Sequence, residues 1–382
     1  MLPYIKIKKL KMLDVVWFIY LTLMMSYVFP GSQKIYTLCL LIVTIIHIII
    51  HKRPKFSKIK YSGFIWYCIF AILVNVSTKW SVYNYNYTGI TNWVIYISCT
   101  LFCLDYAFDN NEDCINFFVI FTYAGVVFSI IALITSPLST YCTDAFSGIT
   151  GQYRTWIGGV SAILVGINFC LHRYYHKGKV HVLFALVNLG TVLASGARGA
   201  LLTIIIICVI FLIKEKNYNK KMLYILVGII GIACGIFIVF KNSALYSAFI
   251  ERVLGAIYND GSTNSVNERA YFMRQAYELF KIHPVIGGGV DTVRGYLNYV
   301  GYWHVTYSHC QYLELLASYG ILGTFIFFYP LIKAFVNKRK NYMFVYIVPI
   351  LLCTYIWSVE YYSFIYIILM ERLQTIRMEN QH

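Results

Sequence analysis

Residues 199–213 read GALLTIIIICVIFLI, a run that contains no charged residue and no proline. A helix needs about 20 predominantly apolar residues to cross the hydrocarbon core of a bilayer. Backbone N–H and C=O groups in that core must be hydrogen-bonded within their own segment, which a helix achieves and a single strand does not. The stretch therefore predicts a transmembrane helix, and its repetition along the chain decides the fold.

Similar apolar windows recur from end to end. They are too long and too uniformly apolar to be the alternating strands of an outer-membrane barrel. We therefore expect an all-α integral membrane protein with about 11–12 transmembrane helices. The other windows are 13–29, 35–50, 61–77, 90–104, 114–135, 156–171, 180–195, 222–240, 311–332, 342–357 and, shorter, 361–370.

Composition and charge agree with this class. The chain is 59% hydrophobic and only 13% charged, which excludes a soluble domain with a water-facing surface. Lys and Arg gather in alternate short loops, such as 52–60, 173–179 and 214–221, and loops of this kind stay in the cytoplasm. We expect both termini to be cytoplasmic. The net charge of +16 arises largely from these basic loops, which also suit the anionic lipid of the inner leaflet. The charge therefore does not indicate a nucleic-acid partner.

One long polar segment interrupts the apolar pattern. No tandem repeat or flexible linker divides the chain, so residues 1–382 are expected to form a single polytopic domain. Residues 241–310 form a large loop between the ninth and tenth spans, and the charge pattern places this loop outside the cell. Ser265 and Glu268 fit a capping box that starts an amphipathic helix over 266–282.

Arg269 falls inside the apolar stripe of that predicted helix, which Phe272, Met273, Ala276 and Phe280 define. In one interpretation the arginine lays its stem on apolar surface and keeps its head in water. In the other, the stripe packs on the membrane bundle and the guanidinium points into a cavity. Both interpretations stay open, whereas Arg274, about 140° away, is expected at solvent or lipid headgroups.

Three further features stand near predicted outer helix ends. Residues 287–289 are all glycine, which suits a turn close to a ligand or another helix, although no P-loop lysine accompanies them. His309 precedes a span, with Glu314 about one turn further in; a histidine at this depth is more often an interfacial residue than a catalyst. Arg198 begins another span, where either snorkelling or a functional role is expected.

Four segments occur in a characteristic order: SGITGQ at 147–152, SGARGALL at 195–202, NERAYFMRQAYELFKIHPVIGGG at 267–289 and SHCQYLELLASYGILG at 308–323. In this order and topology the chain resembles the O-antigen ligase/polymerase superfamily, which includes the Wzy-type polysaccharide polymerases. The family usually has asparagine after the histidine of the last motif, and this chain has Cys310 there.

The resemblance implies an enzyme that transfers a glycan from an undecaprenyl diphosphate carrier to an acceptor hydroxyl, at the outer leaflet of the bacterial cytoplasmic (inner) membrane. Arg198 and Arg269 are the arginines expected to stabilise the charge that grows on the leaving diphosphate. His309 is the expected general base or hydrogen-bond partner of the hydroxyl. The expected outcome is polymerisation of lipid-linked repeat units into a capsular or O-antigen type polysaccharide.

Further residues are expected to bind the substrate: Arg154, Arg274, Arg294, Glu314, Gly287 and Gly289. No metal or other cofactor is expected, because arginines can neutralise a diphosphate. The expected partners are the undecaprenyl-diphosphate-linked oligosaccharide, membrane lipid, a chain-length regulator and a flippase.

Other functions remain open. A ligase uses the same donor with a different acceptor; richness in Ile, Lys, Asn and Tyr is typical of AT-rich genomes, including Gram-positive bacteria without a lipopolysaccharide core, and favours the polymerase. A lipid-linked oligosaccharide flippase would share the spans and arginines, but such transporters usually show an internal repeat. A non-catalytic membrane partner is a third alternative.

Two features of the predicted outer face can have either a structural or a functional role. An aromatic cluster before His309 suits either a sugar-stacking platform or an interfacial aromatic belt, and the belt is the commoner case. It comprises Tyr299, Tyr302, Trp303 and Tyr307. Cys142 and Cys310 are the cysteines expected outside, where the compartment permits a disulfide.

Overall fold

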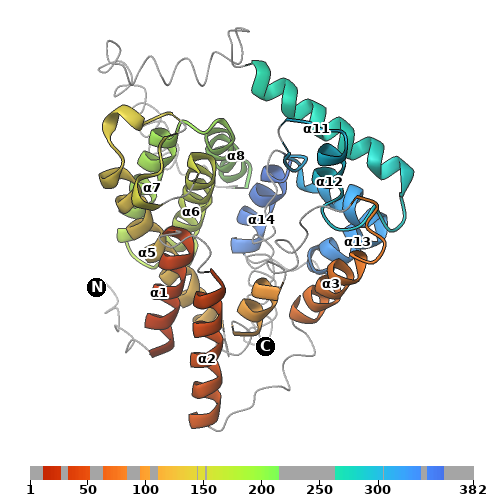
Figure 1. Ribbon diagram of the computed structural model, residues 1–382. Helices are drawn as coiled ribbons and strands as arrows, with labels where there is room; N and C mark the ends of the chain where they lie inside the picture. The colour runs from red at the N-terminus through yellow and green to blue at the C-terminus, as the bar shows by residue number, and fades with distance from the viewer. Residues whose placement is uncertain are drawn as a thin grey trace.

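The computed structural model describes residues 12–26, 33–51, 63–83, 95–103, 111–143, 145–150, 153–214, 263–303, 305–336 and 342–356 (Figure 1). Within these ranges the regular elements are helices, so the all-α prediction is confirmed. The helices are α1 (Met12–Ser26), α2 (Gln33–His51), α3 (Gly63–Ser77), α5 (Asn111–Thr135), η2 (Leu138–Thr140), η3 (Gly148–Thr150), α6 (Arg154–Tyr175), α7 (Val180–Ser195), α8 (Arg198–Lys214), α11 (Thr263–Ile282), α12 (Thr292–Tyr299), α13 (Gln311–Val336) and α14 (Tyr342–Thr354).

The helix boundaries follow the predicted apolar windows closely. Within α5, α6 and α13, three stretches are long and apolar enough to cross a membrane, and shorter apolar helices accompany them among the described residues. The predicted windows 222–240 and 361–370 and the first part of the external loop, 241–262, lie outside the described residues.

The amphipathic helix predicted over 266–282 is α11. It begins at Thr263, three residues earlier than expected, so Ser265 lies in its first turn. The capping-box prediction, which placed Ser265 just before the helix, was therefore wrong, because Ser265 lies inside it.

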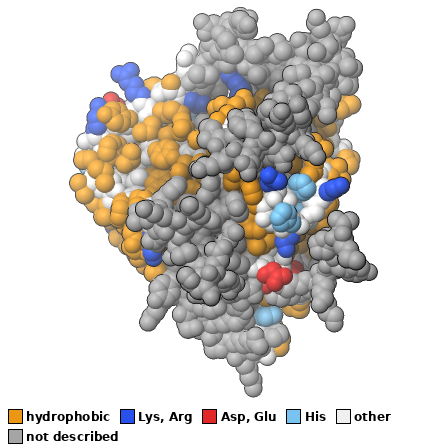
Figure 2. Space-filling view, turned by 180° about the vertical axis from the view of Figure 1, so that it is seen from behind, with side chains coloured by type: hydrophobic (Ala, Val, Ile, Leu, Met, Phe, Trp, Pro, Cys, Tyr) orange, Lys and Arg blue, Asp and Glu red, His pale blue; other side chains and the backbone are white. Residues whose placement is uncertain are grey.

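The surface has the apolar character expected in lipid. Large apolar side chains point outward along several helices, and α2 exposes Ile35, Leu38, Ile42 and Ile49 on its outer side. Figure 2 shows hydrophobic side chains covering broad areas of the described part of one face, with a group of Lys, Arg and His side chains at one place and further Lys and Arg side chains near its edges. In water such patches would favour association, whereas in a bilayer they face hydrocarbon.

The helices pack in two groups that α14 connects. On one side α5, α6, α7 and α8 pack together, α1 packs on α5, and α2 packs on α1. On the other side, α13 packs against α3, α11 and α12. Helix α14 packs against α6 and α8, and Figure 1 shows it between the two groups. The Gln311 N–H donates to the Tyr355 carbonyl at 2.8 Å, which ties the start of α13 to the end of α14.

Ring contacts define the two ends of the bundle. Tyr174 near the end of α6, Phe211 near the end of α8 and Tyr346 near the start of α14 stack on one another at one end. The first residues of α6 and α8 and the last residues of α14 must then lie at the opposite end, together with the start of α13. Arg154, Arg198 and the turn that precedes α13 therefore share one end of the bundle, here called the loop end.

Helix α13 is broken at Gly320, where φ is 62° and ψ is −166°. The break interrupts the backbone hydrogen bonds of the helix, and residues 284–289 supply new partners for the freed N–H and C=O groups. Gly288 and Gly289 donate their N–H groups to the carbonyls of Ala317 and Ser318, each at 2.9 Å. In return Ile321 and Leu322, beyond the break, donate to Pro284 and Val285 at 2.9 and 3.1 Å. The loop is thus joined to a helix at membrane depth with these backbone groups satisfied.

The same loop segment also pairs with the residues after α3. Val82 donates its N–H to the Gly288 carbonyl at 2.9 Å, and the Ser81 hydroxyl donates to the Val290 carbonyl at 3.3 Å. Added Cβ atoms at Gly287, Gly289 and Gly320 would overlap neighbouring backbone. These glycines therefore allow three chain segments to meet, and this junction positions α12.

Candidate functional site

The turn between α7 and α8 holds two of the predicted arginines. Gly196 ends α7 in the left-handed conformation, with φ at 57°, and the Ala197 N–H then donates to the Ser195 hydroxyl at 3.2 Å. Arg198 follows as the first residue of α8, as the sequence predicted. Arg154 reaches the turn from α6, where its Nη1 donates to the carbonyls of Ser195 and Gly196 at 3.4 and 3.3 Å.

Close packing brings together the helices that carry these arginines. Gly158 on α6 faces Ser195, Ala197 and Ala200, and a Cβ at this glycine would overlap the Ser195 hydroxyl. Small residues allow helices to approach closely in a membrane. Both Arg154 and Arg198 are half-buried at this contact, so two cations lie near the loop end of α6 and α8.

The turn before α13 fixes His309 in an uncommon conformation. His309 has φ at 58°, in the left-handed region, which is rare for residues other than glycine. Its neighbours are hydrogen-bonded: the Ser308 hydroxyl donates to the Cys310 carbonyl at 2.9 Å and accepts from the Cys310 N–H at 3.3 Å. Cys310 is buried, and here its backbone, rather than its side chain, serves the turn.

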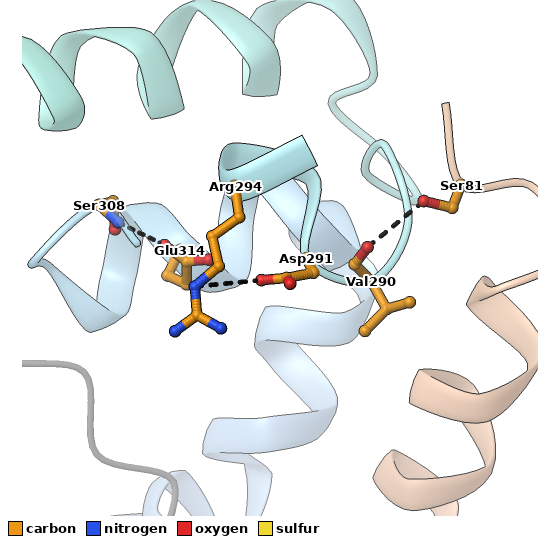
Figure 3. Close-up of polar contacts among 6 residues, drawn as sticks. All are labelled: Ser81, Val290, Asp291, Arg294, Ser308 and Glu314. Carbon is orange, nitrogen blue, oxygen red and sulfur yellow. Dashed lines mark hydrogen bonds and ion pairs between the residues drawn. The ribbon is translucent and has the colours of Figure 1, made fainter. Parts of the chain in front are cut away.

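Glu314 anchors this turn from inside α13. Figure 3 shows its carboxylate reaching back to Ser308, whose N–H donates to Oε2 at 2.7 Å. Glu314 is almost fully buried. The carboxylate predicted to bind substrate thus holds the turn on which His309 lies.

Arg294 and Asp291 form a second polar pair beside Glu314. Arg294 Nε lies 3.7 Å from Asp291 Oδ1, and the arginine is 34% exposed whereas the aspartate is 1% exposed. Figure 3 shows Arg294 between the two carboxylates, with its Nε toward Asp291 and its two terminal nitrogens pointing away from both. The terminal nitrogens are the ones that grip a phosphate in bidentate fashion.

Asp291 was not predicted from the sequence. It has φ at 58° and immediately precedes α12, yet its side chain does not cap that helix. Neither carboxylate oxygen has a hydrogen-bond partner. Burial raises the pKa of Asp291 to about 7, against the lowering effect of Arg294 and with a smaller raising effect from Glu314. Only its position in the turn after the three glycines could have suggested it.

Aromatic rings surround His309. Its ring lies 4.5 Å from Tyr307 and 5.9 Å from Phe272 between centroids. The Arg294 guanidinium lies over the Tyr307 ring at 5.5 Å, which is cation–π distance. Rings therefore link the imidazole to the arginine.

Helix α11 covers this cluster with the face centred on Phe272, Ala276 and Leu279, all buried. The predicted stripe is confirmed at Phe272 and Ala276, whereas Met273 and Phe280 are only partly buried because Leu279 takes the central position. Arg269 is half-buried at the edge of this face and Arg274 is exposed, as expected.

The predicted site residues therefore fall into two groups. Glu314 and Arg294 lie beside Asp291, and Glu314 also holds the turn of His309. Arg154 bonds to the α7–α8 turn that precedes Arg198. In the described part of the chain, α8 packs on α6, α7 and α14, while α11 packs on α12 and α13, so no extensive contact joins the helices of Arg198 and Arg269. Both groups lie toward the loop end.

Gly287 and Gly289 have a structural explanation. Gly287 donates its N–H to the His283 carbonyl at 3.0 Å, and Gly288 and Gly289 donate to α13. These donors are already used, which leaves the segment without the free N–H groups of a phosphate-cradling loop.

The remaining chemical candidates are few. Among the described ranges, no three His, Cys, Asp or Glu side chains meet in a group able to hold a metal ion. Cys142 and Cys310 are both buried thiols, and no disulfide joins them.

Comparison with known proteins gives a match to a protein-family model. Residues 183–328 match the family model described as O-antigen ligase, a range that runs from α7 into α13 and includes both groups of site residues except Arg154. No curated protein sequence matches the chain significantly. The family match supports the O-antigen ligase/polymerase superfamily, to which the four sequence motifs had pointed.

Proposed function

We propose that this member of the O-antigen ligase/polymerase superfamily transfers a glycan from a lipid-diphosphate carrier to an acceptor hydroxyl, and that repeated transfer polymerises undecaprenyl-diphosphate-linked repeat units into a surface polysaccharide. The observation that carries the proposal is His309, clamped in a left-handed turn beside Arg294 at the same end of the bundle as Arg154 and Arg198. The proposed location is the outer leaflet of the cytoplasmic membrane.

The reaction needs two kinds of group. The acceptor oxygen forms a bond to the anomeric carbon while the bond from that carbon to the diphosphate oxygen breaks, and the lipid diphosphate leaves with the electron pair. His309 would take the hydroxyl proton, since imidazole titrates near neutral pH. Fixed guanidinium groups would stabilise the charge that grows on the diphosphate.

The arginines have graded roles in this proposal. Arg198 and Arg269 are assigned to the leaving diphosphate, and Arg154, Arg274 and Arg294 to substrate binding. Arg294 has the clearest local support, because its terminal nitrogens point away from its own carboxylate partners (Figure 3). Removal of one fixed donor to the charge of a transition state costs on the order of 100-fold in rate.

The acceptor distinguishes polymerase from ligase. A polymerase adds the glycan to another lipid-linked repeat unit, whereas a ligase adds it to a different molecule, and the matched family carries the ligase description. Richness in Ile, Lys, Asn and Tyr favours the polymerase. The ligase is the second candidate, because it would use the same donor and the same residues.

The test is a reaction with purified protein in lipid nanodiscs and the lipid-diphosphate-linked repeat unit of the source organism, analysed as a glycan ladder on a gel. Wild type is expected to form a ladder, and Arg269→Ala and His309→Ala are expected to lose at least about 100-fold in rate. Lys281→Ala serves as the matched control, because Lys281 is an exposed cation on the same helix, paired with Glu278 at 2.5 Å.

The outcomes separate the candidates. A single addition that requires a second, non-polymer acceptor would indicate the ligase. Movement of the lipid-linked unit across the bilayer without a new glycosidic bond would indicate a flippase. A ladder of undiminished rate in both variants would remove Arg269 and His309 from the site.

A further inference from the structure

We propose that Tyr271, Tyr302 and Trp303 form an aromatic platform that binds pyranose rings of the glycan and leads them toward His309. The proposal rests on the proposed function and names the part of the molecule that holds the sugar, as distinct from the diphosphate.

The three rings are stacked into one surface. Tyr302 stacks on Tyr271 with centroids 5.1 Å apart and planes at 17°, and Trp303 follows Tyr302 at 6.2 Å and 27°. Trp303 is 77% exposed. The turn after α12 fixes this arrangement, since the Tyr302 N–H donates to the Leu297 carbonyl at 2.9 Å. The exposed indole beside this stacked pair offers a flat apolar surface of the kind that covers the C–H face of a sugar.

The platform is continuous with the candidate site. Phe272 lies beneath it, in edge contact with Tyr302 at 5.6 Å, and the same ring faces His309 at 5.9 Å. Tyr307 also contacts the His309 ring, at 4.5 Å between centroids, and Arg294 lies over the Tyr307 ring. A glycan lying on the platform would therefore bring a terminal hydroxyl toward the imidazole.

Its surroundings favour a sugar over lipid tails. On a helix, residues three and four positions apart are neighbours. The neighbours of Tyr271 on α11 are Asn267, Glu268, Arg274 and Gln275, and all four are exposed or partly exposed. A ring that faces hydrocarbon would have apolar neighbours. Rings flanked by amide, carboxylate and guanidinium groups suit a ligand that has apolar faces and hydroxyl edges.

The structure also separates Tyr299 from the platform. Tyr299 is as exposed as Trp303, at 77%, but it packs against Tyr83 after α3, at 5.5 Å between centroids. Of the four aromatic residues singled out in the sequence, Tyr302, Trp303 and Tyr307 lie on the path to His309 and Tyr299 lies on another. Tyr299→Ala is therefore a matched control for Trp303→Ala, equal in exposure and different in place.

The experiment uses full-length protein labelled with 5-fluorotryptophan in lipid nanodiscs and observed by ¹⁹F NMR. The Trp303 resonance is assigned by its absence in Trp303→Phe. The probe is the lipid-free oligosaccharide that mild acid releases from the lipid-linked donor of the source organism. Its addition is expected to shift the Trp303 resonance saturably. Isothermal titration calorimetry with the same oligosaccharide is expected to show binding about 10-fold weaker in Trp303→Ala, which corresponds to about 1.4 kcal/mol, and less than about twofold weaker in Tyr299→Ala.

A second titration uses lipids spin-labelled along the acyl chain. Broadening of the Trp303 resonance by these lipids, with no response to the oligosaccharide, would overturn the platform and indicate an interfacial aromatic belt. Saturable oligosaccharide binding that leaves Trp303 unshifted would overturn it as well. The ladder assay distinguishes the two proposals: a ladder without a Trp303 response sinks only the platform, and a Trp303 response without glycan transfer sinks only the proposed function.

Discussion

His309 occupies a backbone conformation that costs energy for a residue with a Cβ, and its neighbours hold it there. Ser308 and Cys310 bond to each other across it, and Glu314 accepts from the Ser308 N–H. Strain held in this way is common where a side chain must be aimed. Here the buried carboxylate of Glu314 holds the turn that orients His309, whereas the sequence alone suggested that Glu314 binds substrate.

Substitution of Glu314 tests this division of labour. Glu314→Gln keeps an oxygen that can accept from Ser308, whereas Glu314→Leu leaves that buried N–H without a partner, at a cost of about 1–3 kcal/mol. We expect Gln to retain most of the stability and activity and Leu to lose both, measured by thermal unfolding and by the ladder assay. If Gln were as inactive as Leu while stably folded, Glu314 would be acting as a base instead.

Asp291 gives the folded protein a pH dependence. Its pKa rises from 3.8 to about 7 on burial, so the unfolded chain releases this proton at lower pH than the native state does. The favourable contribution of the protonated carboxyl is complete below about pH 4 and is lost as pH rises toward 7. A tenfold difference in proton affinity between the folded and unfolded states corresponds to about 1.4 kcal/mol of unfolding free energy before the site relaxes.

Asp291→Asn removes this titration. We therefore expect the variant to gain stability relative to wild type as pH rises from 4 to 8, by a few kcal/mol at most, and thermal unfolding at several pH values measures the difference. A constant difference between the two proteins across this range would show that Asp291 ionises normally in the native state.

At the scale of elements, the apolar windows predicted the described helices within a few residues, because the bilayer requirement on length and composition is strong. The break in α13 was not predicted. A glycine in a helix is often tolerated, and the exchange of bonds between 284–289 and α13 depends on residues that are distant in sequence. Sequence periodicity carries no information of that kind.

Gly287 tests the junction. It has φ at 71°, and an added Cβ would overlap the backbone of Ser318 and Tyr319. Gly287→Ala is therefore expected to lower the free energy of unfolding by more than about 1–2 kcal/mol, seen as a lower unfolding temperature, and to displace α12. Gly301→Ala is the control, because Gly301 has a similar φ of 67° with no neighbouring atom within 4 Å. Equal losses in both variants would assign the effect to backbone strain alone.

At the scale of the whole molecule, charged loops predicted sidedness, and ring stacking places Arg154, Arg198 and the turn of His309 at one end. Arg198, Arg269, Arg294 and His309 were expected in one site. The described residues form two groups at the loop end, and how far apart such groups fall depends on helix packing that a single sequence does not encode.

Sidedness is tested by cysteine labelling in whole cells. Tyr299 and Lys179 are both exposed and are expected on opposite sides of the membrane. A membrane-impermeant maleimide should modify Tyr299→Cys in intact cells and Lys179→Cys only after lysis. The reverse pattern would place the His309 turn in the cytoplasm and would contradict an external site.

The most direct test follows both products of the reaction in one vessel. Purified protein in nanodiscs receives the lipid-diphosphate-linked repeat unit, and mass spectrometry counts glycosidic bonds formed and lipid diphosphate released. Wild type is expected to release one lipid diphosphate for each bond formed, and His309→Ala is expected to lose both in parallel. Consumption of the donor without lengthening of the glycan, or lengthening that continues undiminished in His309→Ala, would contradict glycan transfer at this site.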